Sequence, residues 1–158
     1  MTLIIAARGD DHIIVGADSR AVMQSRDGTR IISNTHKKLI KLNKFCCVMI
    51  TGDEEKGIYL IQKFRSKVTR KDDVISVVNK LSEFCQNEFK PLLEFMKLNS
   101  PNYPDVAFII AGLQKKRGIH KLPRLFVIRS LDGFALGEKL DYSIEGKSIL
   151  AAYLFSKA

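Results

Sequence analysis

The pattern of apolar and polar positions at the start of the chain predicts a β-hairpin. Two short stretches rich in apolar residues, 2–8 and 12–17, are separated by Gly9, Asp10 and Asp11. The stretches have the length and the β-branched content of strands, and Gly and Asp tolerate the backbone angles of a tight turn. A hairpin folds the chain back on itself, so Asp18 is expected to lie near the chain start.

A second pair of strands is predicted at residues 38–42 and 45–51, joined by a polar turn at Asn43 and Lys44. Alternation puts Lys38 on the strand face that carries Ile40, and Lys37 on the opposite face. The second strand ends at Gly52. The candidate site residues therefore lie at the strand ends: Thr2, Asp18 with Arg20, Lys38 and Gly52.

From residue 53 the apolar spacing becomes that of helices. One helix is predicted from the acidic turn after Gly52 to about Thr69, and a second begins near Asp72 as its N-cap and kinks or ends at Pro91. Strands return at residues 106–113, 124–129 and 134–144, and a helical stretch covers residues 147–156. Hairpins, then helices, then hairpins indicate an α+β fold in which two antiparallel sheets have helices outside.

Composition bounds the class of protein. At 158 residues with 46% hydrophobic content, the chain can bury one core, and we expect a single domain over residues 1–158. It contains no apolar run long enough to span a membrane, and its start lacks the features of a signal peptide. These features predict a cytoplasmic protein.

The charge distribution and the cysteine spacing argue against a nucleic-acid-binding protein and against a metal-binding protein. The formal net charge is +9, but the basic residues are scattered and accompany no recognisable nucleic-acid-binding module, so we expect no specific nucleic-acid partner. Cys46, Cys47 and Cys85 have no metal-ligand spacing. We interpret all three as reduced and mostly buried, and expect neither a metal nor a cofactor.

Thr2 is the candidate nucleophile. If Met1 is removed, as is expected when a small residue follows it, Thr2 combines a hydroxyl with a free α-amine. The ordinary pKa of that amine, about 7.7 to 8.0, suits a base near neutral pH. Simpler interpretations remain open for the other candidates. Asp18 and Arg20 can form a surface pair worth under about 1 kcal/mol, Lys38 can belong to a solvated edge, and Gly52 can be an ordinary turn.

Several blocks of the chain carry a family resemblance. They are Thr2, the Gly9 turn, and residues 17–21, 37–42, 50–53, 108–112, 123–126 and 132–133. In the order of these blocks, and in the spacing from Thr2 to the Asp-Ser-Arg run, the chain resembles a proteasome-type β subunit of the N-terminal-nucleophile hydrolase superfamily, up to about Ser148. The resemblance implies a four-layer αββα sandwich of two antiparallel β-sheets flanked by helices, with its C-terminal part missing or shortened.

The resemblance also implies a threonine-type endopeptidase. Thr2 would attack the peptide carbonyl, the Lys38 ammonium would lower the pKa values of the Thr2 hydroxyl and amine, and Asp18 would be its counter-charge. Arg20 would brace the same loop, and the Gly52 N–H would stabilise the oxyanion. Ser148 is the candidate for the serine of the family's Gly-Ser-Gly-type turn. In the resemblance, the substrate pocket is lined by Ala21, His36, Ile50 and Glu54. The acid at Glu54 suggests a weak preference for substrates with basic or mixed side chains.

The expected substrates are peptides or unfolded proteins, and the expected assembly is a homo-oligomer, as a ring or another proteasome-like form, with a regulatory partner. A catalytically inactive subunit with a structural or assembly role is the alternative. Thr2 directly behind Met1 favours the enzyme, whereas the Glu-Gly-Lys-Ser turn at residues 145–148 and the lack of the family's later Asp and Ser partners favour the alternative. Residues 22–34 are longer than the family's usual turn and are expected to form a polar loop over the substrate cleft.

Overall fold

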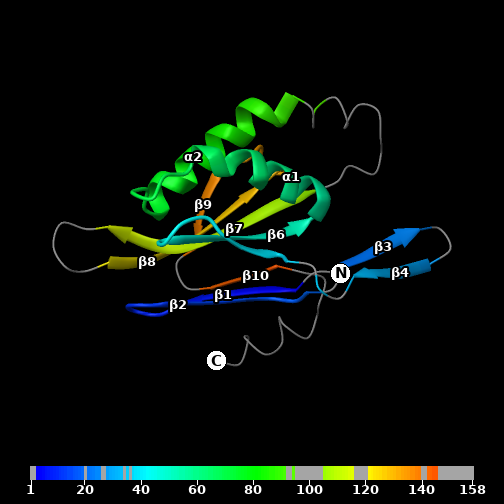
Figure 1. Ribbon diagram of the computed structural model, residues 1–158, viewed down its shortest axis with the longest axis horizontal. Coiled ribbons are helices and arrows are strands. Elements are labelled where there is room, and N and C mark those ends of the chain that lie inside the picture. The colour runs from blue at the N-terminus through cyan, green and yellow to red at the C-terminus, as the bar shows by residue number, and fades with distance from the viewer. Residues whose placement is uncertain are drawn as a thin grey trace.

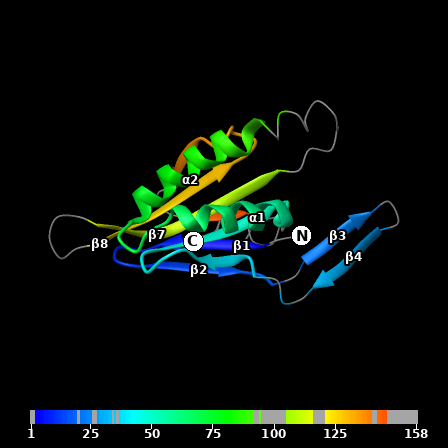
Figure 2. The same ribbon diagram turned by 45° about the horizontal axis from the view of Figure 1, so that its top comes forward.

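The computed structural model describes residues 3–19, 21–25, 28–33, 35, 37–91, 94, 105–115, 121–139 and 142–145. Within this part of the chain, helices lie on one face of a five-stranded sheet and a three-stranded sheet covers the other face (Figure 1). A two-stranded hairpin projects to one side of these layers. Figure 2 shows the same arrangement after a 45° turn.

The first hairpin forms as the sequence predicts. β1 (Ile4–Arg8) and β2 (Ile13–Ala17) are antiparallel, and the Gly9 N–H donates to the His12 carbonyl at 2.9 Å. β10 (Tyr142–Glu145) pairs with the other edge of β1, which gives the order β10-β1-β2. Ile4 and Ala6 are fully buried. β1 is therefore the central strand of this small sheet, with one face in the core.

The predicted polar loop over residues 22–34 is wrong for most of its length. β3 (Ala21–Ser25) and β4 (Gly28–Ser33) form an antiparallel hairpin in which Ser25 pairs with Gly28. Two residues connect the strands, the commonest length for a hairpin connection. β-branched residues such as Val22 and Ile31 favour extended backbone. The polar residues of the segment are compatible with a loop, but its β-branched residues and the short connection favour a hairpin.

The larger sheet contains β5 (Leu39–Lys41), β6 (Cys46–Gly52), β7 (Val106–Lys115), β8 (Lys121–Arg129) and β9 (Leu136–Lys139), antiparallel and in that order. The single strand predicted at residues 134–144 is wrong. Its residues are divided between β9, in the larger sheet, and β10, in the smaller one. An apolar and polar pattern does not tell which sheet a strand joins, so the crossing was not visible in the sequence.

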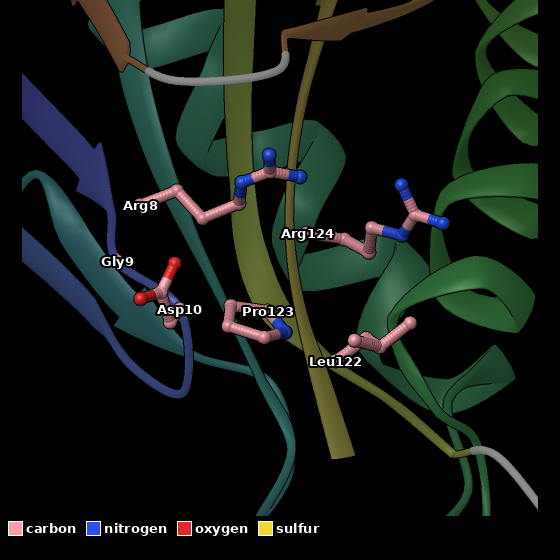
Figure 3. A pocket seen from close by; sticks show the side chains of 6 residues that line it. All are labelled: Arg8, Gly9, Asp10, Leu122, Pro123 and Arg124. Atoms are coloured by element: carbon pink, nitrogen blue, oxygen red, sulfur yellow. The ribbon is translucent and has the colours of Figure 1, made fainter. Parts of the chain in front are cut away.

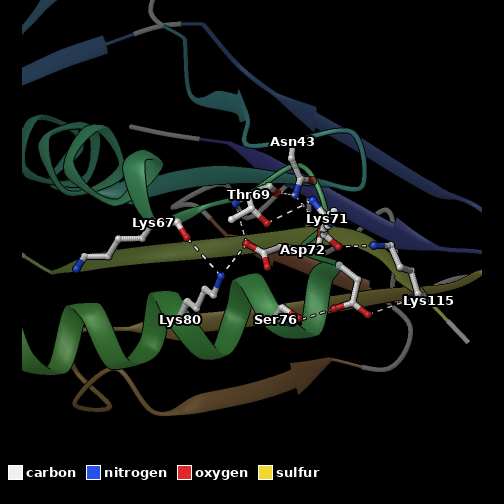
Figure 4. Close-up of polar contacts among 9 residues, drawn as sticks. Asn43, Lys67, Thr69, Lys71, Asp72, Ser76, Lys80 and Lys115 are labelled. Carbon is white, nitrogen blue, oxygen red and sulfur yellow. Dashed lines mark hydrogen bonds and ion pairs between the residues drawn. The ribbon is translucent and has the colours of Figure 1, made fainter.

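α1 (Glu54–Phe64) continues into the 3-10 turn η1 (Arg65–Lys67), and α2 (Val74–Glu88) follows it. Asp53 is the N-cap of α1. The N-cap of α2 is Asp73, whose Oδ1 accepts the Ser76 N–H at 3.0 Å, and the prediction of Asp72 is therefore wrong by one residue. Asp72 instead accepts from Lys80 Nζ at 2.8 Å and so ties α2 to the connection that precedes it (Figure 4).

Two hydrophobic cores hold the layers together. Neighbouring residues of a strand point to opposite faces, so β6 sends Val48 and Ile50 toward the helices and Met49 toward β1. The fold is thus α+β with two antiparallel sheets in face-to-face packing, as predicted. The helix predicted at residues 147–156, which would belong to the fourth layer, lies outside the described residues. In the part of the chain that is described, no helix is long and apolar enough to cross a membrane.

Candidate active site

The centre of the candidate site is the side chain of Lys38, which is completely buried. Lys38 directly precedes β5, and the Ile50 N–H of β6 donates to its carbonyl at 3.1 Å. Its Nζ lies 2.9 Å from Asp18 Oδ1. A buried ammonium needs a counter-charge, and Asp18 provides one. Lys37 is exposed, so the assignment of the two lysines to opposite faces is confirmed.

Asp18 connects this lysine to the beginning of the described chain. It directly follows β2, and its N–H donates to the Leu3 carbonyl at 2.9 Å. Its Oδ1 accepts both the Leu3 N–H, at 3.1 Å, and Lys38 Nζ. The prediction that the hairpin returns Asp18 to the chain start is confirmed. One carboxylate oxygen therefore joins the lysine to the residue that follows Thr2.

A second carboxylate contacts Lys38. Glu54, the first residue of α1, has its Oε1 2.9 Å from Lys38 Nζ. The sequence suggested a substrate-pocket residue here, and an acid in the first turn also suits the helix dipole; neither interpretation anticipates the ion pair. The feature that brings Glu54 to Lys38 is the strand pairing: Lys38 pairs with Ile50, and the chain turns into α1 only a few residues later.

Gly52 makes that turn possible. Its φ is +87°, a conformation that favours glycine, and a Cβ at this position would collide with the Asp105 carbonyl. Alternate N–H groups of a strand point to the same side. Because the Ile50 N–H is directed to the Lys38 carbonyl, the Gly52 N–H is directed to the edge of β6 on which Lys38 lies. Its role as an oxyanion donor stays a prediction.

The other predicted site residues are less well defined. Ile50 is fully buried in the core beneath α1, where it lies against Gly57. This position gives it a packing role, and its contact with substrate stays a prediction. Ala21 is described only through its backbone, at the start of β3. The remaining four lie outside the described residues: Thr2, Arg20, His36 and Ser148.

The cysteines offer no competing nucleophile among the described residues. All three are free of disulfides, with Cys46 and Cys85 buried and Cys47 partly buried, in agreement with the sequence. Burial raises the pKa of the Cys85 thiol to about 12 and also raises the pKa values of Cys46 and Cys47. A thiol that keeps its proton at neutral pH is a poor nucleophile.

A cavity of about 250 Å³ lies at the other end of β1. The side chains of Arg8, Asp10, Leu122, Pro123 and Arg124 and the backbone of Gly9 surround it (Figure 3). Leu3 and Arg8 are separated by roughly 17 Å of extended strand. The cavity is therefore separate from the cluster around Lys38 and contains none of the candidate site residues.

Comparison with known proteins supplies the family. A family model described as proteasome subunit matches residues 2–139. A search among curated proteins found no match. The matched region runs from β1 through β9 and includes the whole cluster of Asp18, Lys38, Gly52 and Glu54. Because the match covers most of the chain, this protein belongs to the proteasome subunit family.

Proposed function

We propose that this proteasome-family subunit is a threonine-type endopeptidase whose nucleophile is Thr2, after removal of what precedes it. The observation that carries the proposal is the buried Lys38 ammonium, bound to the same Asp18 oxygen that accepts the Leu3 N–H. Thr2 is joined to Leu3 by one peptide bond. A positive charge held near a hydroxyl and an amine favours the deprotonated form of each, which is the reactive form.

The proposed reaction has two stages. The Thr2 hydroxyl oxygen attacks the substrate carbonyl while its proton passes to the Thr2 amine, and the resulting oxyanion accepts a hydrogen bond from the Gly52 N–H. Loss of one such donor typically slows catalysis 10²- to 10³-fold. The proton then passes to the leaving amine as the peptide bond breaks. Water attacks the acyl ester, again with the Thr2 amine as base, and releases the second product.

The substrates proposed here are peptides or unfolded proteins in the cytoplasm. Membership of the family supports assembly into a proteasome-like oligomer, since subunits of this family generally form rings. Copies of this chain, with a regulatory partner, would then enclose the cleavage sites.

A catalytically inactive subunit is the second candidate, and one observation favours it. Lys38 contacts two carboxylates, so the three ionised groups together carry one net negative charge. This charge balance weakens the positive field on which the activation of Thr2 depends. An inactive subunit would keep the cluster for its contribution to structure alone.

Intact mass and peptide hydrolysis test the proposal. The mature protein should have the mass of a chain that begins at Thr2, because a preceding residue blocks the amine. Thr2→Ala should abolish hydrolysis of a fluorogenic peptide at unchanged thermal stability, and Thr2→Ser should keep part of it, since hydroxyl and amine survive. A wild type that begins at Thr2, is assembled, and cleaves no peptide in a broad panel would support the inactive subunit instead.

A further inference from the structure

Lys38 is held by two carboxylates that come from different parts of the fold. Its Nζ lies 2.9 Å from Asp18 Oδ1, at the end of β2, and 2.9 Å from Glu54 Oε1, at the start of α1. We propose that Glu54 is a positioning residue of the active site, which fixes the Lys38 ammonium and does not read the side chain of the substrate. This inference rests on the proposed function.

The geometry of an ammonium group supports a positioning role. Lys carries three N–H donors on a flexible four-carbon stem. With one carboxylate partner the group still rotates about the axis of that contact. With two partners, the directions of two N–H bonds are set, and tetrahedral geometry then sets the third. Asp18 and Glu54 together therefore fix both the place and the orientation of the charge.

Glu54 is itself held firmly. The Asp53 N–H donates to the Asp105 carbonyl at 2.7 Å, and Asp53 Oδ1 accepts the Lys56 N–H at 3.1 Å as the N-cap of α1. The left-handed turn at Gly52 directs the chain into that helix. The backbone on the N-terminal side of Glu54 is thus anchored both to Asp105, the residue before β7, and to the first turn of α1. This anchoring fixes the position from which the Glu54 side chain extends.

The exposure of the two carboxylates decides which of them attracts the Lys38 ammonium more strongly. The Glu54 side chain is 16% exposed and the Asp18 side chain 31%. Charges that are less accessible to water are less screened, so their attraction is stronger at equal distance. Asp18 Oδ1 also shares its lone pairs with the Leu3 N–H. Glu54 is therefore a main partner of Lys38, and its largely covered carboxylate is poorly placed to bind a basic substrate side chain.

Three variants separate positioning from substrate reading. Glu54→Ala removes the partner, Glu54→Gln keeps its shape and an acceptor oxygen but not its charge, and Glu55→Ala is the control. Glu55 is exposed in the same first turn and shares any helix-dipole effect. The assay is steady-state hydrolysis of two peptides that carry Arg or Leu at the cleavage site.

For Glu54→Ala we expect kcat to fall on the order of 10²-fold with both peptides, the usual scale for a misplaced catalytic group, at nearly unchanged KM. Glu54→Gln should lie between this variant and wild type, and Glu55→Ala should equal wild type. If Glu54 reads the substrate, its loss will instead raise KM for the Arg peptide alone. That pattern, or a full kcat in Glu54→Ala, overturns the inference while leaving the proposed function intact.

A folding measurement tests the contact without activity. Glu54→Gln should lower the urea midpoint in the wild-type background and shift it much less in a Lys38→Met background, because its partner is then absent. Equal shifts in both backgrounds overturn the inference. A wild type that begins at Thr2 and cleaves nothing overturns the proposed function and this inference with it, so the two failures are distinguishable.

Discussion

The turn at Gly52 carries the chain from β6 into α1, and replacing this glycine by alanine tests how strongly the close packing of that turn constrains the fold. Gly52 has φ +87°, and an added Cβ would stand 2.8 Å from the Asp105 carbonyl carbon and closer still to its oxygen. The obstacle is backbone, so it cannot move as the end of a side chain can. Gly52→Ala therefore combines an unfavourable conformation with a collision.

Alanine substitutions at two other glycines separate the conformational penalty from the collision. Gly133 also has positive φ, 62°, but nothing lies within 4 Å of its Cβ position, so Gly133→Ala isolates the conformational penalty. That penalty is about 1 to 2 kcal/mol. Gly16, an exposed position of β2, has open space around its Cβ position and no positive φ, so Gly16→Ala should stabilise the protein by about 0.5 kcal/mol. Overpacking adds about 1 to 3 kcal/mol, which gives Gly52→Ala a loss of about 2 to 5 kcal/mol.

Urea unfolding measures this order. With a slope near 2 kcal/mol/M, typical for a small protein, a loss of about 3 kcal/mol lowers the midpoint by about 1.5 M. We expect Gly16→Ala at or above wild type, Gly133→Ala below it, and Gly52→Ala lowest, with similar slopes. If Gly52→Ala and Gly133→Ala coincide, the close approach of the Asp105 carbonyl does not constrain the turn, and the reasoning fails.

Two further predictions concern charged groups. Lys38→Ala and Asp18→Asn should each abolish most peptide hydrolysis, and the double variant should lose little more, because groups that act as a unit are strongly non-additive. The control Lys37→Ala should resemble wild type. Additive losses in the double variant would show that Asp18 and Lys38 do not act as one unit. Asp73→Ala should lower the free energy of unfolding by about 1 kcal/mol through loss of the α2 N-cap. Burial by itself raises the pKa of Asp73, but hydrogen bonds from the Ser76 N–H and from β7 bring it below its ordinary value. Its stabilisation is therefore complete above about pH 3.9 and is lost as the pH falls through the lowered pKa. Asp73→Asn keeps the cap, so urea midpoints measured against pH should show a weaker dependence at the acidic end.

The local parts of the fold could be predicted from the sequence because a single clear signal decides each of them. Gly9 and its neighbours predicted the first hairpin, and apolar spacing predicted both helices. The errors lie where two signals compete. Asp72 and Asp73 are both good N-caps, and only the contact of Asp73 with Ser76 decides between them. Residues 22–34 are polar enough for a loop, yet a two-residue connection lets β3 and β4 pair.

The candidate site was predictable only in part. Strand alternation identified Lys38 as the inward lysine, and the hairpin brought Asp18 to the chain start, because both are consequences of period-2 geometry. The contact of Glu54 with Lys38 was not predictable in the same way. It depends on the register between β5 and β6, which pairs Leu39 with Met49. Shifting that register by one residue would turn the side chains to opposite faces.

The described contacts of the Lys38 cluster join residues between Leu3 and Glu54. The β1–β2 hairpin brings Leu3 to Asp18, the β5–β6 pairing sets Lys38 opposite Ile50, and the turn at Gly52 returns Glu54 to the same ammonium. β10 braces β1 from its other edge. The charge centre of the site therefore depends mainly on elements of the N-terminal third of the chain, together with Asp105, whose carbonyl anchors the residue before Glu54. Its integrity should follow the stability of the β1–β2 and β5–β6 pairings, and substitutions in β10 should act on it through β1.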